Sequence, residues 1–180
     1  MLRHPKRGLI LWGLFALVVL TGAAAVPSAR AMADRGVDIV AYELSRTPDR
    51  AAEHNSKLGP DGMNSARTTL LIDFSFLFAY GAFVAGVCVV QGARAGERGY
   101  RGLERLGRLA AMGALIAAAC DAVENVALLR VANGFTEQPW PAVAAAFASV
   151  KFMLITVAIL VGTGLALFTW TKRARFVGDG

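Results

Sequence analysis

The chain has 180 residues, 56% of them hydrophobic, and a formal net charge of +6 at pH 7. So high a hydrophobic share lies outside the range of ordinary soluble domains. The basic residues stand beside apolar runs and do not form a surface interleaved with aromatic residues, so no nucleic-acid partner is expected. Anionic lipid at the cytoplasmic face of a bilayer is the expected partner for these charges.

Four apolar segments each reach the ~20 residues that a helix needs to cross a hydrocarbon core of about 30 Å. They cover residues 9–29, 69–91, 106–129 and 142–171. The sequence therefore predicts an all-α fold, an integral membrane four-helix bundle. No internal repeat divides the chain, so residues 1–180 are expected to form a single domain.

The first segment has a second interpretation, that of a cleavable signal peptide. A basic start and an apolar run precede the small-residue pattern SARAMA at 28–33. The apolar run is longer than the ~7 to 15 residues of a signal core, which favours a retained helix. Cleavage would leave three spans and would not change the orientation of the rest.

The distribution of basic residues predicts how the bundle is oriented. Those that flank the spans are Arg3, Lys6 and Arg7 at the start, Arg94, Arg98, Arg101, Arg105 and Arg108 around the second connection, and Lys172, Arg173 and Arg175 at the end. The positive-inside rule therefore predicts that the protein lies in the cell membrane with both termini in the cytoplasm. In the first connection acidic residues, Glu43 among them, balance the basic ones, so this connection is expected outside.

The first connection, residues 33–68, is too long for a bare linker and carries helix signals. One apolar helical face would hold Val37, Val40, Ala41 and Leu44. Farther on, Thr47 and Pro48 fit an N-cap followed by proline in the first turn, and LGPDG at 58–62 fits a stop and a turn. One or two short amphipathic helices at the outer interface are expected, with a solvated spacer as the alternative.

Small residues recur every four positions on the last two spans and predict close contacts between helices. They are Ala110, Ala114, Ala118 and Ala122, followed by Ala158, Gly162 and Ala166. Cys88 and Cys120 lie at different depths on their spans, so no disulfide is expected between them.

Ionisable residues occur inside three of the apolar segments, where a charge at the bilayer centre costs about 2.5–3.5 kcal/mol. Asp121, Glu124 and Asn125 are spaced by three and four, so they share one face of the third span. A rise of ~1.5 Å per residue puts Asp73 and Lys151 at similar depths in the outer half of the membrane. These side chains are therefore expected to face one another, with Lys151 paired to Asp121 or Glu124.

The charges in this predicted pocket do not cancel, because three carboxyl groups face one lysine. Compensation is expected from protons on the carboxyl groups, from Arg130 reaching down, or from a bound cation or cationic ligand. Tyr80 shares a helical face with Asp73 and adds a hydroxyl. The predicted pocket consists of Asp73, Tyr80, Asp121, Glu124, Asn125 and Lys151.

Three functional hypotheses fit this pocket, beside a purely structural ion pair that fixes the register of the helices. The first is the binding or passage of a proton, a cation or a small amphiphile. The second is an accessory subunit of a homo-oligomer or a larger membrane complex. The third is an intramembrane enzyme acting on a lipid or isoprenoid, with a carboxyl group as general acid or base.

Catalysis is the less favoured of these hypotheses, because the sequence has neither a GxSxG nor an HExxH motif. His4 and His54 both lie outside the apolar segments, so no metal or cofactor is expected. Catalytic residues are therefore not assigned, and the sequence favours binding.

Overall fold

The computed structural model describes the backbone of residues 5–178 and the side chains of residues 8–171. Its five helices are α1 (Pro5–Ala33), α2 (Ile39–Glu43), α3 (Pro48–Gly96), α4 (Arg101–Ala132) and α5 (Trp140–Gly178). The described residues contain no strand, and four of the helices are long and apolar enough to cross a membrane. The predicted all-α four-helix membrane fold is confirmed, although the helices extend beyond the predicted spans.

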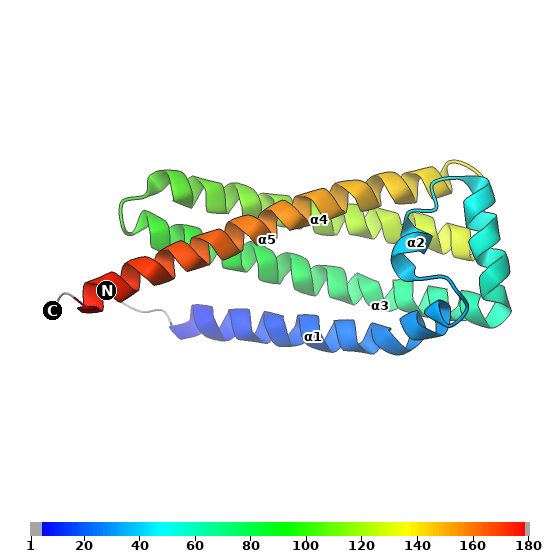
Figure 1. Cartoon of the computed structure of the whole chain (residues 1–180), viewed down its shortest axis with the longest axis horizontal. Coiled ribbons are helices and arrows are strands. Elements are labelled where there is room, and N and C mark those ends of the chain that lie inside the picture. Colours follow the sequence, from blue (N-terminus) through cyan, green and yellow to red (C-terminus); the bar gives the residue numbers. More distant parts are fainter. Residues whose placement is uncertain (1–4, 179–180) are drawn as a thin grey trace.

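The four long helices run alternately up and down the bundle (Figure 1). The start of α1, the end of α5 and the turn between α3 and α4 lie at one end, called here the turn end. The other end, called the capped end, carries α2, the first residues of α3 and the turn between α4 and α5. Helix α3 contacts α1, α4 and α5, whereas α1 packs mainly against α3.

Many large apolar side chains remain exposed along the long helices. Leu9, Trp12, Phe78, Leu160 and Trp170 are each more than 60% exposed. Lipid tails are as apolar as these side chains, so a bilayer solvates them without the penalty that water imposes. The exposed apolar surface is therefore the surface expected to face lipid.

Small residues bring α3 and α4 close together. A Cβ atom added to Gly81 would lie 2.8 Å from the Cβ of Ala118, and one added to Gly107 would lie 2.6 Å from the carbonyl oxygen of Cys88 and 2.9 Å from the Cα of Gly92. Of the small residues predicted to pack, Ala110, Ala114, Ala118, Ala158 and Gly162 are buried, and Ala122 and Ala166 are half-buried. The predicted close packing of helices thus occurs through backbone contact at glycine.

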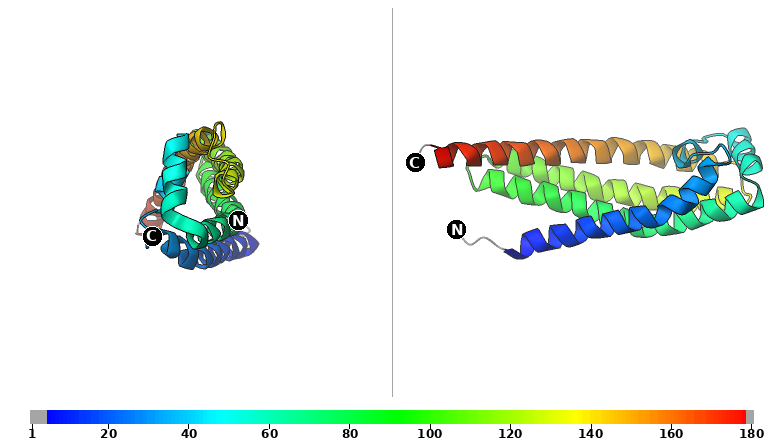
Figure 2. Two further views of the ribbon diagram at one scale, coloured as in Figure 1. Left: turned by 90° about the vertical axis from the view of Figure 1, so that its right-hand side faces the viewer. Right: turned by 60° about the horizontal axis from the view of Figure 1, so that its bottom comes forward.

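Helix α3 bends at Gly59, whose backbone angles (φ 60°, ψ −175°) are accessible almost only to glycine. The arm that precedes the bend, residues 48–58, lies across the capped end of the bundle (Figure 2). It starts as predicted, with the Thr47 side chain accepting a hydrogen bond from the Arg50 backbone N–H. The predicted turn at 58–62 corresponds to this bend, but the helix resumes at once, so the second long helix begins well before residue 69.

Side-chain hydrogen bonds tie α3 to the last turn of α4. Asn55 Nδ2 donates to the Val131 carbonyl oxygen (2.8 Å), and Arg67 Nη2 donates to the Ala132 carbonyl oxygen (2.7 Å). The last carbonyl groups of a helix have no partner within the helix, so these bonds satisfy acceptors that would otherwise need water. The arm and the bundle are therefore held as one unit at the capped end.

The short helix α2 has one exposed and one buried side. Val40 and Leu44, four residues apart, are 45% and 44% exposed, whereas Tyr42 is fully buried. Tyr42 also donates a hydrogen bond from its hydroxyl to Asn55 Oδ1 (3.1 Å) on the arm. Val37, predicted to share the face of Val40 and Leu44, instead precedes the helix and is buried.

Candidate functional site

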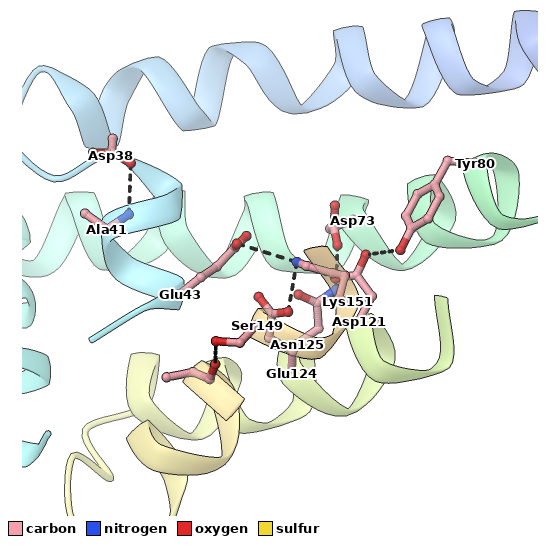
Figure 3. A network of polar contacts seen from close by, with 11 residues as sticks. Asp38, Ala41, Glu43, Asp73, Tyr80, Asp121, Glu124, Asn125, Ser149 and Lys151 are labelled. Atoms are coloured by element: carbon pink, nitrogen blue, oxygen red, sulfur yellow. Dashed lines mark hydrogen bonds and ion pairs between the residues drawn. The ribbon is translucent and has the colours of Figure 1, made fainter. Parts of the chain in front are cut away.

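Lys151 of α5 lies at the centre of a set of acidic side chains (Figure 3). Its Nζ atom is 2.8 Å from Glu124 Oε2, 3.0 Å from Asp121 Oδ1 and 3.5 Å from Glu43 Oε2. Lys151 is only 7% exposed, so these ion pairs are shielded from water. Both of the pairings predicted for Lys151 are present at once.

Two further hydrogen bonds extend this set onto α3. The Tyr80 hydroxyl donates to Asp121 Oδ2 (2.8 Å), and Asn125 Nδ2 donates to Asp73 Oδ2 (2.7 Å). The structure thus brings together all six residues of the predicted pocket, although their role in binding stays a prediction. The polar cluster, as we call it, consists of Glu43, Asp73, Tyr80, Asp121, Glu124, Asn125 and Lys151.

Glu43 is the member of the polar cluster that the sequence did not predict. It is the last residue of α2 and reaches the bundle from the first connection, where its charge was predicted only to balance the basic residues. Its side chain is only 13% exposed. No local spacing pointed to this contact, because it joins residues 108 positions apart.

Arg130 does not compensate the acidic groups, so this alternative was wrong. Its guanidinium carbon lies 5.5 Å from the ring centre of Trp140 and 5.8 Å from that of Phe135, and the residue is exposed. Cation–π contact with two aromatic rings holds the arginine at the capped end and away from the cluster. The cluster therefore contains four carboxyl groups and one amine.

Glu124 is the most deeply buried carboxyl group of the cluster, with no exposed surface. Its Oε2 forms the ion pair with Lys151, whereas Oε1 has no hydrogen-bond partner among the described residues. Buried polar atoms in proteins nearly always have a partner, so such an atom calls for an explanation such as a proton or an ion. Glu124 thus has binding capacity that the chain itself leaves unused.

The surroundings of the cluster differ toward the two ends of the bundle. Toward the capped end lie Glu43 and the half-buried Asp73. Toward the turn end the helices pack through an apolar core that contains Cys88, Ala114 and Ala158. A larger apolar core, which includes Tyr42, Leu70 and Leu128, also packs on the capped-end side, so apolar cores flank the cluster in both directions.

Burial raises the pKa of Glu43, and the carboxylates of Asp121 and Asp73 add to the effect, while Lys151 opposes it. A carboxyl group whose pKa is raised by folding stabilises the folded state at low pH, and this contribution is lost as the pH rises through the folded-state pKa. We expect the difference in melting temperature, Glu43→Gln minus wild type, to become more positive as the pH increases from 5 to 8. Melting curves at several pH values measure this difference.

The control for this experiment is Glu53→Gln, which removes a half-exposed carboxylate from the neighbouring arm. Pairing with Lys57 lowers the pKa of Glu53, so its contribution to stability is lost only at pH values below about 4.5, and the Glu53→Gln variant should show almost no pH-dependent difference from the wild type between pH 5 and 8. A Glu43→Gln melting temperature that falls relative to the wild type with rising pH would contradict the assignment of Glu43 as a buried group.

Among the described residues, no group of three or more His, Cys, Asp or Glu side chains is arranged to hold a metal ion. No protein-family model, curated protein or solved structure matches the chain. The polar cluster offers two kinds of chemistry. Its carboxyl groups can exchange protons, and its carboxylate oxygens surround a single amine.

Proposed function

We propose that this membrane protein uses the polar cluster to bind an exchangeable proton or a small cation. The observation that carries the proposal is Glu124, a fully buried carboxyl group whose Oε1 lacks a hydrogen-bond partner among the described residues. With four carboxyl groups around Lys151, full ionisation would leave a net charge of about −3 inside the bundle, which is costly in a low-dielectric interior. A proton or a cation on the cluster removes part of this cost.

The surroundings of the cluster favour binding over passage across the membrane. The core next to the cluster on the turn-end side is formed by Ala85, Cys88, Ala111, Ala114 and Ala158, which offer no ionisable relay. Passage would then need a second subunit or a different conformation. The full burial of Glu124 also favours a proton or a small cation over an amphiphile.

We propose in addition that the capped end lies outside the cell. Five arginines, Arg94, Arg98, Arg101, Arg105 and Arg108, lie at or near the turn between α3 and α4. A cytoplasmic position for this turn satisfies the positive-inside rule and lets the arginines contact anionic lipid. Glu43, which joins the polar cluster from α2, would then enter it from the extracytoplasmic side.

We expect the purified protein to show an infrared carboxyl band that titrates with pH, and the Glu124→Gln variant to lose the largest part of it. The substitution keeps the shape of the side chain and removes its exchangeable proton. Infrared difference spectra between two pH values, recorded in detergent micelles, measure the protonated carboxyl groups. Added sodium or potassium chloride tests whether a cation displaces the proton.

Glu104→Gln is the matched control, because Glu104 lies on the same helix and pairs with Arg108 at the surface. This variant should keep the band that the Glu124→Gln variant loses. If the Glu124→Gln variant titrates like the wild type, the proposal fails. A purely structural ion pair would instead give a folded wild-type protein with no titrating band assignable to Glu124.

A further inference from the structure

The capped end contains a cavity of about 420 Å³ that is separate from the polar cluster. Its polar lining comes from Ser45, Arg46, Thr47, Arg50 and His54, on the segment between α2 and α3 and on the first turns of α3. No carboxylate lines the cavity. Its volume falls within the range of ~300–1,000 Å³ that is typical of small-molecule sites.

Both arginines that line the cavity are available for a ligand. Neither guanidinium forms an ion pair or a hydrogen bond with any other described residue. The acidic groups near the cavity in the sequence are Asp38, Asp49 and Glu53, of which Glu53 pairs with Lys57 (2.7 Å) and the Asp38 carboxylate accepts the Ala41 backbone N–H (2.9 Å). None of the three lines the cavity or forms an ion pair with Arg46 or Arg50, so both guanidinium groups are free to pair with an anion.

The remaining lining residues are held in place by the chain. His54 is 9% exposed, and its Nδ1 lies 3.0 Å from the Oγ of Ser45, which fixes the imidazole ring at the cavity wall. Ser45 in turn donates to the Tyr42 carbonyl oxygen (2.7 Å), so its hydroxyl proton is not free for nucleophilic chemistry. These contacts indicate a binding cavity and not a catalytic serine–histidine pair.

The backbone around the cavity is fixed by local contacts. Thr47 is the N-cap of α3, and its side chain accepts a hydrogen bond from the Arg50 backbone N–H. Arg46 has a φ of 47°, in the left-handed region that a bulky residue adopts only when the surrounding structure requires it. The Arg46 carbonyl oxygen accepts a hydrogen bond from Gln138 Nε2 (3.3 Å), which ties this segment to the turn before α5.

We propose that this cavity binds a phosphate group through the guanidinium groups of Arg46 and Arg50. Arginine guanidinium groups bind phosphate oxygens by charge-assisted, frequently bidentate hydrogen bonds. The cavity is larger than a phosphate ion, so it accommodates a phosphate with an organic substituent. Such a group comes either from a soluble phosphate compound or from the headgroup of an anionic lipid, and the two share the same recognition chemistry.

The test is a binding titration of the full-length protein in detergent micelles with three probes, followed by microscale thermophoresis. The probes are inorganic phosphate, dihexanoyl phosphatidic acid and the zwitterionic dihexanoyl phosphatidylcholine. We expect inorganic phosphate, phosphatidic acid or both to bind more tightly than phosphatidylcholine. Arg50→Gln and Arg46→Asn should each weaken that binding about ten-fold or more, since each removes a charge-assisted contact.

Arg35→Gln is the matched control, because Arg35 is an exposed arginine at the same end of the bundle that pairs with Asp61 (3.9 Å) and does not line the cavity. It should leave binding unchanged. Binding of inorganic phosphate alone assigns the site to soluble phosphates, and binding of phosphatidic acid alone assigns it to lipid headgroups. Absence of binding by both, or an equal loss in the Arg35→Gln variant, overturns the proposal. Melting temperatures confirm that each variant is folded.

Discussion

Replacement of Lys151 by methionine is expected to lower the free energy of unfolding by about 3–5 kcal/mol, the usual cost of removing one partner from a buried ion pair. The amine lies within 3.5 Å of Glu43, Asp121 and Glu124, and it is the only cation in the polar cluster. Methionine fills a similar volume, so the loss reflects the uncompensated carboxylates more than a cavity. Unfolding by a denaturing detergent or by heat, in mild detergent micelles, measures the change.

The control for Lys151→Met is Lys57→Met, which breaks a half-exposed ion pair on the arm. A surface pair of this kind contributes about 0–1 kcal/mol, so this variant should unfold close to the wild type. Adding Glu124→Gln to Lys151→Met should recover part of the stability, because it removes the most buried of the uncompensated charges. A Lys151→Met variant as stable as the wild type would show that the amine is not required to neutralise the cluster.

Replacement of Gly107 by leucine is expected to be the most disruptive single change at the α3–α4 contact. A Cβ atom at this position would meet the carbonyl oxygen of Cys88 at 2.6 Å and the Cα of Gly92 at 2.9 Å. Both are backbone atoms, which cannot rotate away as a side chain can, so the two helices must move apart. Overpacking costs about 1–3 kcal/mol, and we expect a loss near 3 kcal/mol in the free energy of unfolding.

The matched control is Gly113→Leu, on the same helix, where an added Cβ meets nothing within 4 Å. This substitution adds the same side chain at an open position and should leave stability nearly unchanged. The same unfolding assay compares the two variants. Equal destabilisation by both would mean that the loss comes from glycine replacement as such and not from the contact with α3.

The long helices and the core of the polar cluster were predictable because each depends on local sequence. Apolar runs of sufficient length predict spans without reference to the rest of the chain. The spacing of Asp121, Glu124 and Asn125 fixes their common face, and the position of Lys151 along its span fixes its depth. The cost of exposing charge to lipid then leaves few arrangements other than the observed one.

The contribution of Glu43 and the course of the first connection were not predictable in the same way. Pairing of Glu43 with Lys151 joins residues 108 positions apart, through a helix of five residues whose orientation depends on the burial of Tyr42. Periodicity placed Val37 on one face with Val40 and Leu44, but α2 begins only at Ile39, so Val37 lies outside the helix and is buried. Arg130 likewise remains at the surface because of aromatic rings contributed by the following turn.

Helix α2 contributes to two sites through adjacent parts of one short segment. Glu43 faces the buried amine of Lys151, while Ala41 and Ser45 line the cavity at the capped end. If occupancy of the cavity shifts this segment, the environment of the Lys151 amine changes with it. Thermodynamic linkage then requires that ligand binding in the cavity and ionisation of the carboxyl groups around Lys151 alter each other by the same factor.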